Sequence, residues 1–343
     1  MGRMRGLAIA AAALAAAGGA AFAAPDCQML QVGELPVSLD GGMITVAVQV
    51  NGKPARMIVD TGSETTLIFR ESAKVLGLKP HRVENIEFYG VGGETDGGVV
   101  RVKELRVAQF VATDQDLIVT GEHALGDTVG LLGSAFLMQA DVEFDLADKT
   151  IRFFEPKNCV GDQVVYWGKA YSVAPMIALP TRDVHVTMAL NGASIVAEMD
   201  SGSSNTIVTV GGAAKAGVTP RSSGVIAAGA SLGMGAKAEQ TFEAVFPTFS
   251  FGDETIKNAR LQIADLFEAD KEVELGSHIA ASVIDNAPQM LLGADFLKAH
   301  RVYIARGQKK VYISYTGGPV FEAPQRPPAT STAAPPPAVP ASR

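Results

Sequence analysis

The stretch Val-Asp-Thr-Gly-Ser at residues 59–63 decides the fold of this chain, because it occurs a second time as Met-Asp-Ser-Gly-Ser at residues 199–203. At average residue usage, the tetrad Asp-Ser/Thr-Gly-Ser/Thr arises by chance in about one or two chains in a hundred of this length. Two copies in one chain therefore indicate an internal repeat, and the sequence around each copy tests that interpretation.

The surroundings of the two copies match. Strand-like runs that end in Asn-Gly lead into both tetrads, at residues 44–52 and 184–192, and the two acidic residues are 140 positions apart. A second shared block, which begins Leu-Leu-Gly, occurs at residues 131–137 and 291–297, where the offset is 160. A whole domain is thus duplicated, and its period is too long for a solenoid.

Composition predicts a globular protein rich in β-strands. The 343 residues are enough for two domains, and short runs of Val, Thr and Ile alternate with many of the 36 glycines. The net charge of −7 is spread along the chain without a basic stripe, so nucleic acid is not an expected partner.

Residues 1–24 are predicted to be an export signal. Arg3 and Arg5 precede an apolar, Ala-rich run, and Ala21-Phe22-Ala23 has the small-x-small pattern of a cleavage site. The alternative is a retained membrane anchor, although Ala favours insertion only weakly and no stop-transfer charges follow. We expect an exported protein, periplasmic or secreted, without stable membrane insertion once the signal is removed.

The two cysteines, Cys27 and Cys159, flank the first repeat. An oxidising compartment allows such a pair to close into a disulfide that ties the start of the repeat to its end. Two buried free thiols are the alternative.

Each tetrad follows a predicted strand and begins a loop. There, Gly62 and Gly202 let the backbone approach closely and offer amide donors to the neighbouring carboxylates. The hydroxyls of Thr61 and Ser201 are placed to bond across to the opposite loop.

The hydroxyls of Ser63 and Ser203 are expected to bond the outer oxygens of the carboxylates. If the two repeats face each other, Asp60 and Asp200 meet. Two carboxyl groups at such a short distance cannot both ionise, so they share one proton. The ionised partner then activates a water, and the protonated partner donates to a carbonyl oxygen.

The duplicated tetrads, each followed by Leu-Leu-Gly, resemble the aspartic peptidases, both the retropepsins and the two-lobed pepsin-like enzymes. The resemblance is closest to bacterial retropepsin-like aspartyl proteases, here with two copies fused in one chain. It implies an all-β fold of two pseudo-symmetric acid-protease β-barrel lobes with short helices, and an aspartic endopeptidase that acts on proteins or peptides with Asp60 and Asp200 as catalytic residues. Single-lobe relatives must dimerise, whereas one copy of this chain is expected to suffice for the active site.

The resemblance also assigns supporting residues. The glycines of the two Leu-Leu-Gly blocks, Gly133 and Gly293, are expected to pack under the catalytic loops. A glycine-rich hairpin between the blocks corresponds to the substrate-covering flap of the family, and its residues here are Tyr89, Gly90, Val91, Gly92 and Gly93. A longer, Ala-rich second candidate lies at residues 224–240, and whether one flap closes or both is left open.

The expected domain organisation follows the repeats. Residues 317–343 are rich in Pro, Ala, Ser and Thr and are predicted to be a disordered tail. The full division is a signal at 1–24, an N-terminal lobe at 25–160, a connection at 161–183, a C-terminal lobe at 184–316 and the tail at 317–343.

Several alternatives were weighed against this interpretation. One tetrad alone is more often a turn than a site. A lobe pair can also keep its acidic residues and act as a catalytically silent peptide-binding or anchoring module of the cell envelope. Gly-Ala-Ser-Leu-Gly at residues 229–233 matches the nucleophile elbow of serine hydrolases, but no strong strand precedes it and no helix is predicted after it. The five histidines show no paired spacing, so neither a metal site nor a cofactor is expected.

Overall fold

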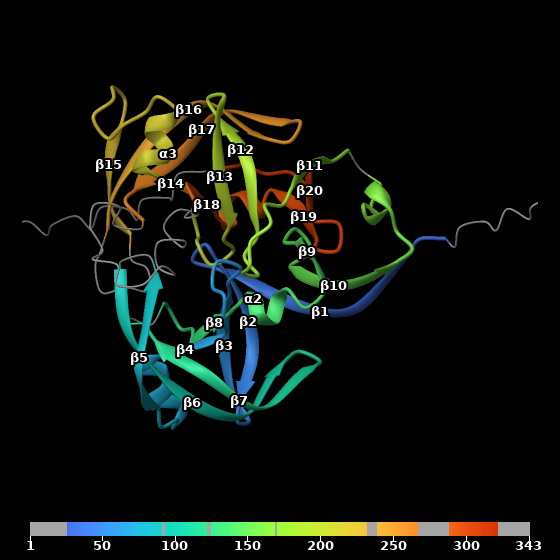
Figure 1. The fold of residues 1–343 in the computed structure, drawn as a ribbon, viewed down its shortest axis with the longest axis vertical. Helices are drawn as coiled ribbons and strands as arrows, with labels where there is room; N and C mark the ends of the chain where they lie inside the picture. The colour runs from blue at the N-terminus through green and yellow to red at the C-terminus, as the bar shows by residue number, and fades with distance from the viewer. Residues whose placement is uncertain are drawn as a thin grey trace, which may run out of the picture.

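The computed structural model describes residues 26–90, 93–121, 125–168, 170–231, 239–266 and 288–321. Its strands form two lobes, which lie one above the other in Figure 1 and are joined by a sheet between them. The expected signal at residues 1–24 lies outside the described residues.

The two lobes repeat one topology. Strands follow the order β2-β3-β8-β4-β7-β6-β5 in the first lobe and β12-β13-β18-β14-β17-β16-β15 in the second, and the pairings β2–β6 and β12–β16 close each set into a barrel. The first-lobe strands are β2 (Met43–Val50), β3 (Lys53–Val59), β4 (Leu67–Phe69), β5 (His81–Gly90), β6 (Gly93–Val107), β7 (Phe110–Thr120) and β8 (Gly130–Leu132). The second-lobe strands are β12 (His185–Leu190), β13 (Ala193–Met199), β14 (Ile207–Thr209), β15 (Ile226–Ser231), β16 (Glu239–Phe251), β17 (Glu254–Ala264) and β18 (Met290–Leu292).

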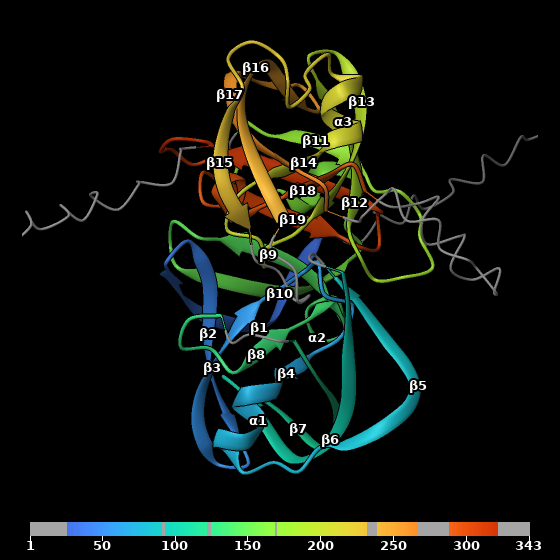
Figure 2. The same cartoon turned by 90° about the vertical axis from the view of Figure 1, so that its left-hand side faces the viewer.

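A six-stranded antiparallel sheet joins the lobes in the order β11-β20-β19-β9-β10-β1. At its centre β9 of the first lobe pairs with β19 of the second, with Phe144 opposite Val302. Figure 2 shows these strands between the two barrels. The strands are β1 (Gln28–Asp40), β9 (Asp141–Asp145), β10 (Thr150–Lys157), β11 (Ser172–Pro175), β19 (His300–Ala305) and β20 (Lys310–Tyr315). β11 lies within the expected connection at 161–183, so part of that connection is a strand of the sheet.

Short helices complete each lobe: α1 (Arg70–Leu76), α2 (Ser134–Leu137), the 3-10 helix η1 (Gly161–Val164), α3 (Val210–Lys215) and α5 (Ala294–Leu297). α1 ends at Leu76, because Gly77 adopts a left-handed conformation (φ 72°) and its N–H donates to the carbonyls of Ala73 and Lys74. The hairpin turns before both tetrads are Asn-Gly pairs with positive φ at both residues, as type I′ turns require.

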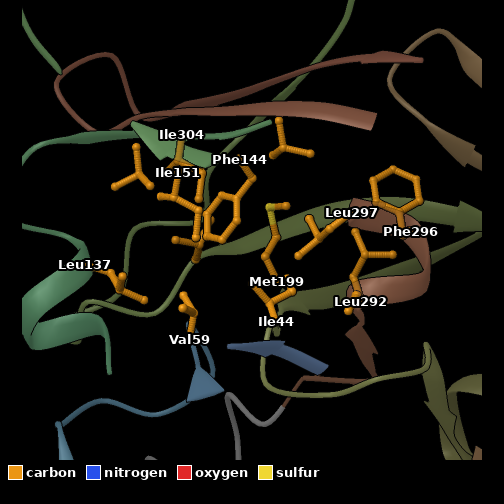
Figure 3. Packing of buried hydrophobic residues seen from close by; sticks show 14 of the residues in the cluster. Ile44, Val59, Leu137, Phe144, Ile151, Met199, Leu292, Phe296, Leu297 and Ile304 are labelled. Carbon is orange, nitrogen blue, oxygen red and sulfur yellow. The ribbon is translucent and has the colours of Figure 1, made fainter. Parts of the chain in front are cut away.

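One continuous apolar core runs through both lobes. Figure 3 shows Val59, Phe144 and Ile151 of the first lobe close to Met199 and Ile304 of the second. Because Val59 and Met199 directly precede Asp60 and Asp200, burial of these side chains anchors both tetrad loops to the same core.

Charged groups also cross the lobe boundary within the central sheet. Asp145 of β9 is buried and pairs with Arg301 of β19 and with Arg152 of β10. Arg152 also pairs with the fully buried Glu143, which accepts a hydrogen bond from the Tyr166 hydroxyl. Each carboxylate therefore has a cationic partner, as burial of charge requires.

A disulfide joins Cys27 and Cys159, the pairing that the sequence suggested. It ties the start of β1 to the chain just after β10 and encloses a loop with a sequence separation of 132.

One expectation is wrong. A disordered tail was expected from residue 317, but Phe321 is buried in the second lobe, where it packs edge-on against Phe249 and stacks on Phe296. Val320 also packs against the core, so residues 317–321 belong to the lobe, and residues 322–343 lie outside the described part. Within the described ranges, no helix has the length and apolar character needed to cross a membrane.

Candidate active site

Each tetrad begins at the end of a strand that pairs with the strand of the Leu-Leu-Gly block. β8 runs parallel to β3 and hydrogen-bonds it up to Val59, and the Asp60 N–H then donates to the Leu132 carbonyl at 3.0 Å. The second lobe repeats this arrangement, with the Asp200 N–H donating to the Leu292 carbonyl at 3.0 Å. The shared block at 131–137 and 291–297 thus holds the loop that carries the aspartate.

Thr61 and Ser201 lock the two loops together. The Thr61 N–H donates to Ser201 Oγ and the Ser201 N–H donates to Thr61 Oγ1, both at 3.0 Å. Each hydroxyl in turn donates to a carbonyl of the opposite lobe, Thr61 to Met199 and Ser201 to Val59. All four bonds cross the lobe boundary, as the tetrad pattern predicted for these two hydroxyls.

The two glycines bring the carboxyl groups into contact range. A Cβ atom built on Gly202 would lie 2.3 Å from Asp60 Cγ, and one built on Gly62 would lie 2.8 Å from Asp200 Cγ. Each aspartate therefore lies against the glycine of the other lobe, and any side chain at either glycine would displace a carboxyl group.

Backbone donors fix the orientation of both carboxyl groups. Asp60 Oδ1 accepts from the N–H groups of Gly62 and Ser63 at 2.9 and 3.1 Å. Asp200 Oδ1 accepts equivalent bonds from Gly202 and Ser203 at 2.9 and 3.0 Å.

The expected role of the two serine hydroxyls is wrong. Ser63 Oγ donates to the Thr65 carbonyl at 2.9 Å and Ser203 Oγ donates to the Asn205 carbonyl at 2.7 Å. Their protons therefore stabilise the bend of each loop and do not bond the outer carboxylate oxygens, because the nearby backbone carbonyl is a closer acceptor in this turn.

The pKa values of the two carboxyl groups are raised together. Burial, followed by the charge of Asp200 and a hydrogen bond between the two side chains, raises the pKa of Asp60 well above its usual range. Burial also raises the pKa of Asp200, but bonds from Ser203, Asp60 and Gly202 oppose that rise. These directions are those expected of two neighbouring carboxyl groups that cannot both ionise.

Comparison with known proteins agrees with this geometry. A family model described as aspartyl protease matches residues 46–136 and 186–296, which is more than half of the chain and includes one tetrad in each match. The chain belongs to the aspartyl protease family. It is also similar to the crystal structure of an aspartic proteinase from Irpex lacteus, at 12% identity and a TM-score of 0.49, over 86% of this chain and 99% of that one. A comparison with curated protein sequences found no match.

In this aspartyl protease family member, the Leu-Leu-Gly glycines lie directly against the tetrad loops. A Cβ atom on Gly133 would lie 2.3 Å from the Thr65 carbonyl oxygen, and one on Gly293 would lie 2.5 Å from the Asn205 carbonyl group. Ser134 adds a bond that sequence reasoning missed, because its Oγ donates to the Thr61 carbonyl at 2.8 Å.

The second lobe supports its loop differently. Half-buried Asp295 accepts bonds from both the N–H and the hydroxyl of Thr206, at 2.9 and 2.7 Å, where the first repeat has Ala135. This asymmetry is visible in the second shared block, where Gly-Ala-Asp replaces Gly-Ser-Ala.

The candidate flap is a β-hairpin. β5 and β6 pair up to Gly90 opposite Gly93, and Tyr89 is the penultimate residue of β5. Val91 and Gly92 lie outside the described residues. The second candidate is also a hairpin, in which β15 and β16 pair up to Ser231 opposite Glu239. Ser231 thus ends the edge strand β15, and residues 232–238, where a nucleophile elbow would require a helix, lie outside the described residues.

Three ionisable residues near the aspartates were not found from sequence. Asp183, His185 and Glu198 come together in the second lobe, with Glu198 two residues before Asp200. Burial raises the pKa of Glu198 to about 7, against the hydrogen bond from His185. A comparison of the two repeats could have identified Glu198, because the first repeat has the apolar residue Ile58 at the equivalent position.

Proposed function

We propose that this protein is an aspartic endopeptidase that hydrolyses peptide bonds with a water held between Asp60 and Asp200. The observation that carries the proposal is the hydrogen-bonded contact between two carboxyl groups, one from each lobe, whose pKa values are both raised. Membership of the aspartyl protease family supports the same reaction class.

The chemistry follows from the unequal protonation of the pair. Ionised Asp200 takes a proton from the water as its oxygen attacks the peptide carbonyl carbon, while protonated Asp60 donates to the carbonyl oxygen. This gives a neutral tetrahedral diol. Its breakdown transfers a proton to the amide nitrogen, breaks the C–N bond and releases a carboxylic acid and an amine. No cofactor enters this scheme.

The substrate in this proposal is an extended peptide that lies between the lobes under the β5–β6 hairpin. Extended peptides bind protein edges through main-chain hydrogen bonds, and side-chain pockets then set sequence preference. We further propose that the protein acts after export, in the periplasm or outside the cell, and that one copy is sufficient.

The test is hydrolysis of casein and of a peptide library by the wild-type protein and by Asp60→Asn and Asp200→Asn variants, with and without pepstatin. Both variants should lose hydrolysis while their thermal unfolding remains cooperative. Full activity in either folded variant would falsify the mechanism. If the wild type binds peptides without cleaving them, the protein is instead a peptide-binding module.

The claim about one copy is tested by specific activity over a wide dilution series, together with sedimentation mass. Activity per chain should be constant, because both aspartates come from one chain. Loss of activity in step with a dimer-to-monomer transition would contradict it.

A further inference from the structure

Asp183, His185 and Glu198 form a compact group on one face of the β12–β13 hairpin. The register places His185 directly opposite Glu198, so their side chains project from the same face. Asp183 lies two residues before His185, just ahead of β12, and its carboxylate joins the same group. One ligand atom from each residue lies within 4.8 Å of the others, and His185 Nε2 is 3.7 Å from a Glu198 carboxylate oxygen.

The fold itself does not need these three groups. The equivalent cross-strand pair of the first lobe is Thr45 opposite Ile58, and Met43 takes the place of Asp183. Ile58 belongs to a small buried apolar cluster there, with Met43 packed against it. The same barrel position is therefore stable with Met, Thr and Ile in place of the three ionisable residues, and the second lobe carries charge there for another reason.

The acidic groups of this cluster have few polar partners around them. Glu198 and His185 expose only 9% and 5% of their surface, and half-buried Asp183 has one buried oxygen, Oδ1, without a hydrogen-bond partner in the described part of the chain. Among the described residues, the Asp183 carboxyl group interacts with the Thr181 hydroxyl and with the imidazole of His185, and the same imidazole is also the partner of Glu198. One imidazole thus serves two carboxyl groups, and a bound cation would balance their negative charge.

We propose that Asp183, His185 and Glu198 bind one Zn²⁺ ion in the second lobe. An imidazole nitrogen with two carboxylate oxygens is a donor set that suits zinc, which leaves a fourth position for water. Tetrahedral zinc at about 2.0–2.1 Å from each ligand sets neighbouring donor atoms roughly 3.4 Å apart, so the observed 3.7 Å gap needs little side-chain movement.

The site is open to solvent on one side. Asp183 is only partly buried, whereas His185 and Glu198 are buried, so an ion reaches the inner ligands past Asp183. The zinc site does not depend on peptide hydrolysis, and its primary test measures binding alone.

The experiment is calorimetric titration of zinc chloride into the chain prepared without an affinity tag. The wild type should bind one ion, and His185→Gln and Glu198→Gln should each weaken binding at least about tenfold, because a three-residue site loses a direct ligand. Cobalt(II) added in place of zinc should give visible absorption bands that the two variants lack. Magnesium should not compete, since it prefers six oxygen ligands.

Glu254→Gln is the matched control. It breaks another His–carboxylate pair of the same lobe, in which His300 Nε2 lies 3.0 Å from Glu254 Oε1, and it should leave zinc affinity unchanged. If the glutamine variants fail to fold, His185→Thr and Glu198→Ile replace them, because the first lobe already uses Thr and Ile at these positions.

Three results would overturn the proposal: no binding by the wild type, unchanged binding in folded His185 and Glu198 variants, or equal loss in Glu254→Gln. A fourth is the absence of zinc binding together with a preference for Lys or Arg substrates that Glu198→Gln removes, since the acidic group would then be a pocket for a basic side chain.

Discussion

Thr61 and Ser201 donate their backbone N–H groups to each other's hydroxyl oxygens at 3.0 Å, and each hydroxyl then donates to a carbonyl of the opposite lobe. Both residues are buried. The two lobes are thus joined directly beneath the paired carboxyl groups, so the distance between Asp60 and Asp200 depends on this exchange.

Removal of either hydroxyl should therefore lower both stability and hydrolysis. Thr61→Val and Ser201→Ala each leave buried donors without partners, at a cost of about 1–3 kcal/mol per unsatisfied group. Chemical denaturation measures this loss, and kcat should fall with it. Ser63→Ala is the control, because Ser63 Oγ bonds only within its own loop, and a Ser201→Ala variant no less stable than this control would contradict the role of the exchange.

Addition of one methyl group at Gly202 should abolish hydrolysis. In Gly202→Ala the new Cβ would lie 2.3 Å from Asp60 Cγ, so the carboxyl group must move away from Asp200. Gly307→Ala is the matched control, because nothing lies within 4 Å of a Cβ at that position and its backbone carries no positive-φ strain. Peptide hydrolysis and a crystal structure of the Gly202 variant check this expectation, and a Gly202→Ala enzyme with full activity would contradict it.

The pair Asp60 and Asp200 should make the folded state more stable in mild acid than at neutral pH. The pKa of Asp60 is raised in the folded protein, so its stabilising contribution is fully present below the unfolded carboxyl value of about 4 and is lost as pH rises through the folded value. The Asp60→Asn variant removes this dependence. Thermal unfolding from pH 4 to pH 8 should show a smaller loss of stability for Asp60→Asn than for the wild type, and parallel curves would refute the raised pKa.

The disulfide should stabilise the protein through its long loop. Cys27→Ser with Cys159→Ser is expected to lose about 2–5 kcal/mol, since the unfolded chain regains the freedom of the enclosed segment. Denaturation with and without a reductant measures the effect. The reductant should destabilise the wild type alone, and an equal response of the double variant would point to some other target of the reductant.

Much of the candidate site could be predicted from the sequence because duplication is a one-dimensional signal. The constant offset of 140 identified Asp60 and Asp200 as equivalent, and the short-range rule that Asn-Gly favours a type I′ turn placed a hairpin before each of them. The cross-lobe hydroxyl bonds of Thr61 and Ser201 followed from the same symmetry.

Predictions that concerned local competition between acceptors were less successful. Ser63 and Ser203 were assigned to the carboxylates, but each hydroxyl bonds a carbonyl two residues away, which only the actual path of the loop reveals. Phe321 was expected in a disordered tail because composition averages over a segment, whereas its aromatic ring packs against Phe249 and Phe296 of the second lobe.

The sequence by itself determined that two equivalent lobes exist, where each aspartate lies in its loop, and which residue types surround it, because these depend on local pattern and repetition. Only the tertiary structure decided how the lobes meet. The β9–β19 pairing, the contact of Gly202 with Asp60, and the meeting of Asp183, His185 and Glu198 join positions that are distant in the chain or lie on different strands. Such contacts depend on strand register and on packing across the lobe boundary, and neither is encoded in the spacing of residues along one strand.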